Sequence, residues 1–509
     1  MRRPVQQSGP RLYGWGLCAA LVALCAGCAP FRNIDDEVRR SRTDAFESWR
    51  RTRAGRAGSI LTLTKTLTRT SYEARMRRAR SGGGRDIVLK GTLDTASAVL
   101  LAMGNNKRLR AALQDKEIAL GQVTEAWAEA LPKLDFVASY TRLDKVPGVN
   151  FGGVNIEMGF VNNYALELVL TQPIFRGGAT AAGIRAARIF SHLADQQVAG
   201  TVQDVMHETR RGYCDVLLSR RLVRVSEGDL RLAKAHLRDV EARHAAELAP
   251  RYDVLRAGVE VRNVEAELIK RQNALRLGMA ALFKTLGVSQ DSQVELSGGL
   301  TYDPVSTDLE ECAERALRQR PEILQAELTA RLNEEAVIDA RSGAKPTVDA
   351  TFTHRYARPD PHDTTQDQWD REWNAALVLK WPLFDGFATR ARVRQARAEL
   401  RRSRILLADA EEQVLLEVRQ AILSIEDARK LVTSQQENLK RAREALRLAI
   451  EGHKVGVRSE LERRDAEQAL SVTESLYYQA VHAHERAKLA LERAVGMLKD
   501  QNAPGKPGR

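Results

Sequence analysis

The sequence is poor in aromatic residues, in cysteine and in long apolar runs. Aromatic residues make up 5% of the chain and charged residues 28%. Because Ala, Leu, Arg and Glu crowd long stretches instead, the composition favours long helices over compact mixed domains. Beyond residue 27, no stretch is long and apolar enough for a transmembrane helix, so any segment that spans a membrane is expected to be a β-strand.

Cysteine is too scarce for a disulfide scaffold. Of the five cysteines, Cys18 and Cys25 lie in an N-terminal apolar segment and Cys28 follows it directly. Only Cys214 and Cys312 remain, and two cysteines do not make a disulfide framework in a chain of this size. We expect both to pack as small apolar residues.

Enzyme motifs are missing as well. The chain contains no Walker-type phosphate loop, no HExxH and no GxSxG. His482 and His484 are two positions apart, so they point to different faces of a helix and make a poor metal pair. We therefore expect no enzyme activity, no catalytic residue, no cofactor and no metal site.

The net charge of +13 does not indicate a nucleic-acid partner. From Gly91 onward, basic residues are interleaved with Glu and Asp at helical spacings, without a zinc framework or an RNA-binding aromatic signature. The densely basic stretch 39–85 is the exception. We interpret it as a flexible solvated segment and assign it no further role.

The N-terminus has the pattern of an export signal. Basic residues at positions 2, 3 and 11 precede an apolar run over 12–27, which is short for a membrane span. The run ends in Cys25-Ala26-Gly27-Cys28, which resembles a bacterial lipobox. We predict a signal peptide at 1–27 and lipidation of Cys28, with palmitate as a marker. A plain cleaved signal peptide is the main alternative.

Two short motifs reveal an internal repeat. QPIFRGG at 172–178 and WPLFDGF at 381–387 share a layout 209 positions apart, and each marks a junction where a strand stops and a helix begins. The shared positions are Pro173 with Pro382, Phe175 with Phe384, and Gly177 with Gly386. We predict two copies of helix, strand, loop, strand, long helix, turn and long helix.

Each copy contains two runs in which apolar and polar residues alternate. The apolar positions are Leu134, Phe136, Ala138 and Tyr140; Tyr164, Leu166, Leu168 and Leu170; Val348, Ala350 and Phe352; and Trp373, Ala375, Leu377, Leu379 and Trp381. Runs of about nine to eleven residues suit tilted membrane strands. A half-buried soluble sheet would give the same alternation, but the export signal favours the membrane. We predict that Leu168 and Leu377 face lipid and that Glu167 and Lys380 face a wet lumen.

Four strands in one chain cannot close a barrel, and open edges in lipid leave backbone groups unpaired. Two chains would give eight strands, about the number whose interior is filled by side chains. Three chains would give twelve, roughly enough for an open channel. The sequence thus requires an oligomer and favours a trimer.

The helices after the junctions are long and follow a seven-residue period. No proline interrupts 178–246, a run of roughly 100 Å as a helix. One seam contains Val216, Val223, Leu230 and Leu237, and its counterpart contains Ile425, Val432, Leu439 and Leu446. This period indicates left-handed supercoiling against neighbouring helices.

Together, the export signal, the two repeats and the junction motifs resemble the TolC-like outer-membrane efflux proteins. The resemblance implies a mixed α+β membrane protein, a trimeric 12-stranded outer-membrane β-barrel continued by a periplasmic α-helical coiled-coil tunnel. It also implies an adaptor protein and an inner-membrane pump as partners in efflux or type I secretion. We place the domains at 1–27 (signal peptide), 28–91 (lipidated basic segment), 92–297 and 298–499 (repeats) and 500–509 (disordered tail).

The resemblance also assigns residues at the helical turns. HKVGVRSELERRDAEQAL, from His453, is similar to the tip motif of the family, and AAELAPRYDVLRA, from Ala245, to its other tip. The implied adaptor-facing residues are Glu247, Leu248, Ala249, Pro250, Asp253, Gly456, Val457, Arg458 and Ser459. Glu462 and Asp465 correspond to acids that face the lumen as a gate, although a solvated face paired with Arg463 or Arg464 would explain them too. Glu247 departs from the pattern because it replaces a glycine, so either the turn differs or it is strained.

A periplasmic adaptor, or another coiled-coil structural lipoprotein, is the alternative function. Such a protein would also have a lipobox and a coiled-coil hairpin. It would have a single hairpin with flanking β-domains, however, whereas this chain has two hairpins and paired strands.

Overall fold

The computed structural model describes residues 87–496 apart from positions 147, 153, 158, 306 and 364. The predicted signal peptide, the Cys28 lipidation site, the basic stretch 39–85 and the tail at 500–509 lie outside these residues. The chain divides into two units, Met1–Arg85 and Asp86–Arg509, and the description below concerns the second. Among its described helices, none has the length and apolar character needed to cross a membrane.

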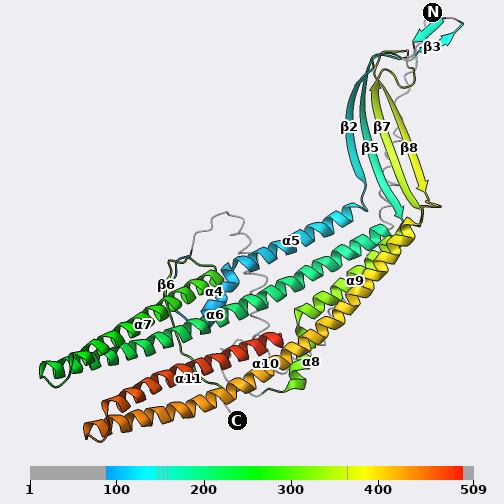
Figure 1. Cartoon of the computed structure of the whole chain (residues 1–509). Helices are drawn as coiled ribbons and strands as arrows, with labels where there is room; N and C mark the ends of the chain where they lie inside the picture. The colour runs from blue at the N-terminus through cyan, green and yellow to red at the C-terminus, as the bar shows by residue number, and fades with distance from the viewer. Residues whose placement is uncertain are drawn as a thin grey trace, which may run out of the picture. The chain divides into compact units, whose positions relative to one another are not determined.

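The two repeats have matching elements (Figure 1). The first contains α4 (Thr95–Asn105), α5 (Lys107–Ala128), β2 (Lys133–Arg142), β5 (Asn162–Arg176), α6 (Ala179–Ala245) and α7 (Arg251–Leu286). The second contains α8 (Leu309–Gln319), α9 (Pro321–Ser342), β7 (Thr347–Arg358), β8 (Asp370–Lys380), α10 (Ala388–Lys454) and α11 (Glu460–Ala494). The element order predicted from the sequence is confirmed.

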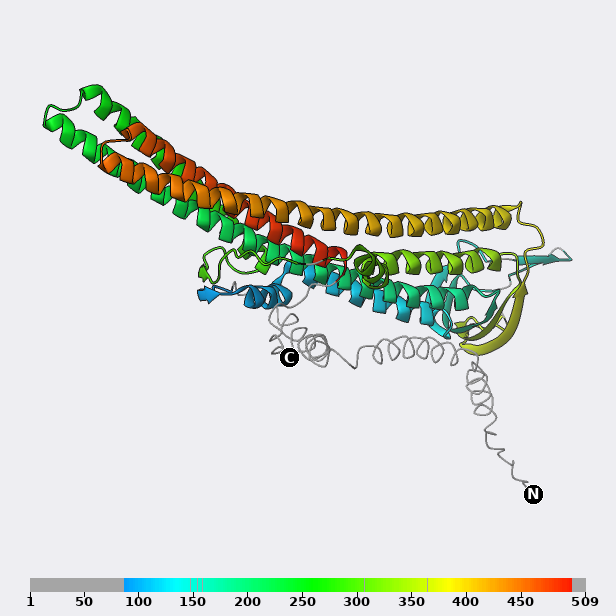
Figure 2. The ribbon, with the colours of Figure 1, turned by 90° about the horizontal axis from the view of Figure 1, so that it is seen from below.

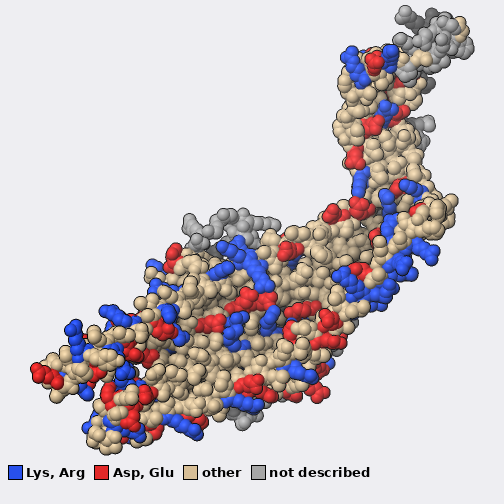
Figure 3. Space-filling view, in the orientation of Figure 1, with Lys and Arg blue, Asp and Glu red and all other residues tan. Residues whose placement is uncertain are grey.

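The four long strands form one antiparallel sheet in the order β2-β5-β7-β8. Register places Phe136 opposite Leu168, and Phe352 opposite both Leu170 and Ala375, so the apolar positions share one face. On the other face, Arg355 forms ion pairs with Glu167 (3.1 Å) and Glu372 (3.0 Å). The predicted alternation is confirmed, and the surface over the sheet has few charged side chains compared with the helices (Figure 3).

The first junction differs from its prediction. β5 does not stop at Pro173 but continues to Arg176, with a register shift between Pro173 and Phe175 where it pairs with β7. A bulge accommodates proline because it removes the need for a ladder hydrogen bond from that nitrogen. In the second repeat β8 ends at Lys380, before Pro382, as expected. Gly177 and Gly386 then adopt φ of 64° and 65°. These left-handed conformations turn the backbone of each repeat from its strand into its long helix.

α6 and α10 have 67 residues each, and with α7 and α11 they form two hairpins that run side by side (Figures 1 and 2). The seam residues predicted from the seven-residue period are buried or half-buried throughout. Val216, Leu282 and Leu286 belong to one core cluster, and Val418, Ile425 and Leu491 to another. Cys312 packs against the second cluster, as predicted for a small apolar residue.

Two small strand pairs were not predicted. β1 (Lys90–Leu93) pairs in parallel with β6 (Gln293–Leu296), and β3 (Gly148–Phe151) forms a hairpin with β4 (Val154–Glu157). β1 crosses the boundary that the sequence suggested between residues 91 and 92. The buried Tyr213 hydroxyl, which is 2.9 Å from the Leu93 carbonyl oxygen and 2.6 Å from that of Ser297, ties this pair to α6.

Candidate functional site at the helical tips

The two turns between the long helices have the same backbone conformation. They lie at the ends of the hairpins opposite the sheet (Figure 1). Glu247 has φ of 62° and Gly456 has φ of 74°, both in the left-handed region. The Leu248 amide donates to Arg243 O (2.8 Å), and the Val457 amide donates to Gly452 O (2.9 Å). The first turn is therefore strained rather than different, at a cost of about 1–2 kcal/mol for a side chain at this φ.

A histidine closes each turn, a feature that the sequence interpretation missed. His244 Nδ1 is 2.8 Å from Ala249 O, and His453 Nδ1 is 3.2 Å from Arg458 O. The two histidines occupy equivalent repeat positions, so the repeat itself was the signal that could have found them. Between them, the tips expose Leu248 (78%) and Val457 (81%), two large apolar side chains.

α11 begins with a capping box. The Glu462 carboxylate accepts hydrogen bonds from Ser459 N (2.8 Å) and Ser459 Oγ (3.1 Å), and Ser459 Oγ caps the Glu462 amide. The second carboxylate oxygen of Glu462 lies 3.5 Å from Arg458 Nη1. The hydrogen bonds from Ser459, helped by the charge of Arg458, lower the pKa of Glu462. Glu462 therefore pairs with Arg458, and not with Arg463 or Arg464.

The first tip has no equivalent cap. Pro250 precedes α7 and offers no side-chain hydrogen bond, and Asp253 supplies the only acid in the first turn of that helix. Asp465 in the second tip is exposed, like Glu462. The tips are thus alike in backbone but differ in how their returning helices begin.

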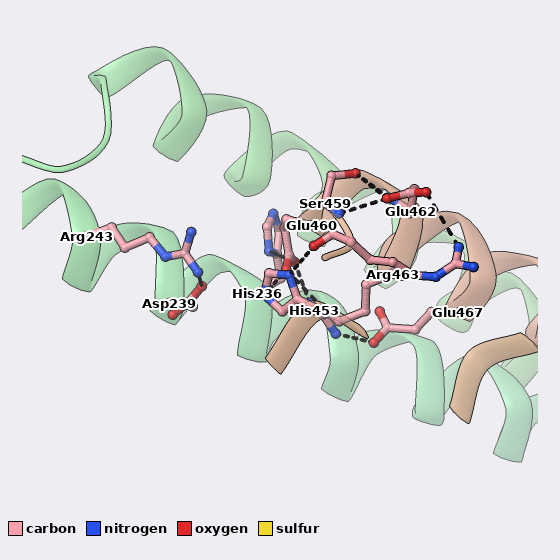
Figure 4. A network of polar contacts seen from close by, with 10 residues as sticks. His236, Asp239, Arg243, His453, Ser459, Glu460, Glu462, Arg463 and Glu467 are labelled. Carbon is pink, nitrogen blue, oxygen red and sulfur yellow. Dashed lines mark hydrogen bonds and ion pairs between the residues drawn. The ribbon is translucent and has the colours of Figure 1, made fainter. Parts of the chain in front are cut away.

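Glu460 joins the second tip to the first hairpin (Figure 4). Its carboxylate accepts from Arg463 Nε (3.0 Å), lies 3.2 Å from His453 Nε2, and lies 3.2 Å from His236 Nδ1 on α6. His236 Nδ1 is buried and forms no hydrogen bond with the described part of the chain, so its contact with Glu460 is electrostatic. Burial alone would raise the pKa of Glu460, but the hydrogen bond and charge of Arg463 and the two imidazoles outweigh it and lower that pKa.

Burial also shifts the pKa values of two groups near the Glu460 carboxylate, His236 and Glu467. Burial lowers the pKa of His236, and the positive charges of Arg464 and Arg463 add to the effect, against Glu460 and Asp239. Burial raises the pKa of Glu467, although its contact with Arg463 opposes that shift. The lowered pKa of His236 therefore favours the neutral imidazole in the packed state, although Glu460 attracts the protonated one.

Further polar contacts follow the same pair of helices away from the tip. Along α6 and α11, the pairs are Asp229 with Ser471 (2.8 Å), Asp215 with His482 (2.6 Å), Arg210 with Glu492 (2.6 Å) and Asp204 with Arg493 (2.8 Å). His482 thus has a carboxylate partner between helices. The two hairpins are held together by polar contacts along their length.

Among the residues that the structure describes, one group of metal-type ligands lies in the loop after β7 and at the start of β8. Asp360, His362 and Asp370 have ligand atoms within 4.8 Å of one another. Asp360 is already engaged, since it accepts from His362 N (2.8 Å), Asp363 N (3.2 Å) and Gln368 Nε2 (3.0 Å). These bonds account for its position as the anchor of a turn.

Comparisons with known proteins agree with this architecture. The sequence profile of the family described as "Outer membrane efflux protein" matches residues 99–288 and 312–497. The protease secretion protein PrtF of Dickeya chrysanthemi is 24% identical over 79% of this chain and 88% of its own length. Protein CyaE of Bordetella pertussis is 29% identical over 49% of this chain, a match that spans only 53% of CyaE.

Solved structures share the fold. The CmeC outer membrane channel of Campylobacter jejuni superposes with a TM-score of 0.69 at 17% identity, over 79% of this chain and 85% of that one. The outer membrane protein VceC of Vibrio cholerae gives 0.67 at 18% identity, over 79% and 96%.

Proposed function

Because the chain belongs to the outer membrane efflux protein family, we propose that it is the outer-membrane channel of a tripartite efflux or type I secretion system. In this role it passes substrates from an inner-membrane pump and a periplasmic adaptor to the exterior. The observation that best supports the proposal is the direct run of each strand pair into a 67-residue helix. One chain thereby joins a membrane-facing sheet to a long helical conduit, and it is not an enzyme.

The proposed assembly is a homotrimer with a closed barrel. β2 and β8 are the edges of the sheet, and each edge needs a partner strand in lipid. Three copies satisfy both edges around a ring of twelve strands, roughly wide enough to keep an open lumen. The apolar face of the sheet would then meet lipid, and the Glu167–Arg355–Glu372 ion pairs would line the lumen.

We assign the two tips to the adaptor and the gate. The exposed residues of both turns would meet the adaptor, and Glu462 and Asp465 would face the lumen of the narrowed tunnel. Exposure of both carboxylates in the single chain supports this assignment.

Native mass and conductance test the channel together. We expect the purified protein in detergent to have the mass of three chains and to conduct ions in planar bilayers. Closed barrels also resist unfolding in detergent, so unheated samples should migrate differently from heated ones in gels. A mass of one or two chains, or no conductance, would rule the channel out.

Lipid anchoring of Cys28 is a separate proposal. It rests on the lipobox-like sequence Cys25-Ala26-Gly27-Cys28 alone. Labelled palmitate should enter the wild-type protein and not the Cys28→Ala variant. Equal incorporation in the two would show that Cys28 is not the lipidated residue.

A further inference from the structure

The linker between the two repeats contacts both of them. It runs from the end of β6 to the start of α8, and we call its residues 297–303 the strap. At the start of the strap, the Ser297 carbonyl oxygen accepts a hydrogen bond from the Tyr213 hydroxyl on α6 (2.6 Å). Leu300 then packs against one core cluster of the first repeat and another of the second. The strap therefore joins the first hairpin to the second.

The far end of the strap covers His484 on α11. Tyr302 meets the imidazole edge-on, with ring centroids 4.9 Å apart and ring planes at 72°. The apolar cluster around Tyr302 contains Val432, Ala480 and Val481. The last two lie one helical turn before His484, on the same face of α11. His484 is only 1% exposed, and neither of its ring nitrogens has a hydrogen-bond partner within the described chain.

The repeat shows that packing at this position does not need an imidazole. The counterpart of His484, at the offset of 209 positions, is Leu275, which packs against the core cluster of the first repeat. Burying a polar atom without a hydrogen-bond partner destabilises the packed state, so packing alone favours leucine at both positions. His484 thus places a titratable ring in a contact that the first repeat makes with apolar atoms.

We propose that the strap is an acid-sensitive contact, docked on α11 while His484 is neutral and released when the ring takes up a proton. A neutral ring fits between Tyr302 and the apolar cluster. A charged ring needs water or a hydrogen-bond partner, which the buried site does not supply. Release removes the contact of the strap with the second hairpin and leaves its contact with Tyr213 on the first.

The charged groups around the ring agree with this behaviour. On α11, Glu485 Oε1 is 3.9 Å from His484 Nδ1, beyond hydrogen-bond distance. Lys488, one turn beyond His484, pairs with Asp303 of the strap (3.1 Å), and α10 contributes the apolar Val432. Burial lowers the pKa of His484 and the charge of Lys488 adds to the effect, against Asp303. Docking is therefore strongest above the ordinary pKa of about 6.5 and weakens as pH falls from there towards the lowered value.

A spin label on the strap tests the proposal in the full-length protein in detergent. In a background with Cys214→Ala and Cys312→Ala, a nitroxide is attached to Thr301→Cys, an exposed position between Leu300 and Tyr302. Its spectrum reports motion on the nanosecond timescale, at which released loops move. We expect a restricted spectrum at pH 7. The ratio of mobile to restricted label should rise towards pH 5, by at most about tenfold per pH unit because one proton is bound.

Two histidine variants assign the response. His484→Leu, which copies Leu275 of the first repeat, should keep the label restricted at both pH values. His192→Gln, on α6 near the sheet, is the matched control and should respond as the wild type does. A label that stays restricted at pH 5 in the wild type would overturn the proposal. Equal mobilisation in His484→Leu would overturn it as well, because another group would then be the one that titrates.

Asp303→Asn separates the proposed switch from the ion pair with Lys488. Losing this pair should raise the mobile fraction at both pH values, while the rise on acidification persists. Loss of the acid response in Asp303→Asn, with the label restricted throughout, would assign the effect to the ion pair and not to His484. The measurement requires no channel activity, so its outcome is independent of the proposed function.

Discussion

At the scale of single residues, Glu247 adopts a backbone conformation that suits glycine. We predict that Glu247→Gly stabilises the first tip by about 1 kcal/mol, because the left-handed cost of a side chain disappears. Hydrogen exchange of the Leu248 amide, which is bonded to Arg243 O, should then slow by roughly fivefold. Faster exchange would mean that the Glu247 side chain makes a contact worth more than the strain.

The opposite substitution tests the second tip. Gly456→Val places a β-branched residue at φ of 74°, which should distort the turn and impair efflux while leaving the trimer intact. Nothing lies within 4 Å of a Cβ atom at this position, so conformation rather than crowding is tested. Loss of trimer together with efflux would place Gly456 in the structural core instead.

The burial of residues that follow a local period was predictable from the sequence. Contacts that depend on the packing between hairpins were not. The seam from Val216 to Leu237 follows from a seven-residue spacing that any helix turns to one side. The meeting of His236 with Glu460 depends on how α6 lies against α11, which no local pattern encodes. Glu462 was found from its motif. Its bonds to Ser459 have a signature in the sequence that was overlooked, the S-x-x-E of a capping box, whereas its contact with Arg458 depends on the shape of the turn.

At the scale of elements, the α6–α11 contact should weaken in acid. The pKa of His236 is lowered in the packed state by burial and by Arg464 and Arg463, against Glu460 and Asp239, while His453 shares the Glu460 carboxylate. The contact is therefore most stable above the ordinary pKa of about 6.5 and is lost as pH falls through the lowered value. Tip opening, measured as channel conductance, should rise from pH 7 to pH 5.

A matched pair of variants isolates His236. His236→Gln should make conductance insensitive to pH in this range, because a neutral amide replaces the titrating ring. His192→Gln, on α6 near the sheet, should keep the wild-type pH response. An unchanged response in His236→Gln would assign the effect to another group.

The sheet faces can be tested by charge. Leu168→Arg should cost about 2–4 kcal/mol if the residue meets lipid near the midplane, and the trimer should lose heat resistance in gels. Lys380→Glu on the opposite face should be tolerated, because a wet lumen solvates either sign. Equal losses for both variants would contradict the assignment of one face to lipid and the other to the lumen.

Elements of ordinary length were predictable, whereas very short ones were not. The four long strands have enough alternating positions to be recognised, but β1 and β6 have four residues each and pair across some 200 positions. Pro173 misled the prediction of a strand end because a bulge, which depends on the partner β7, lets β5 continue.

At the scale of the whole molecule, the two hairpins of the repeats are joined along their length and would contribute together to the proposed conduit. Each hairpin ends at a tip. Polar contacts, from the Asp204–Arg493 pair to the His236–Glu460 pair, bind the two hairpins of a chain to each other. In the proposed trimer, opening the tunnel end would require these contacts to break or to shift, whereas strand pairing would hold the barrel together. In the proposed assembly, the tip is the part of the molecule where a small free-energy change would alter the pore.

The proposed gate is testable without disturbing the fold. Each chain would contribute the Glu462 and Asp465 carboxylates to a narrow ring, and such rings attract cations and repel anions. Because Glu462 also completes the capping box, Ala would remove both its charge and its structural role. Gln preserves the box, so Glu462→Gln with Asp465→Asn removes charge alone. Single-channel recordings should show the reversal potential in a salt gradient moving toward zero, with Glu437→Gln, on the shaft of α10, as a control that keeps the wild-type value. A reversal potential unchanged in the double variant would mean that these acids are only a solvated helix face.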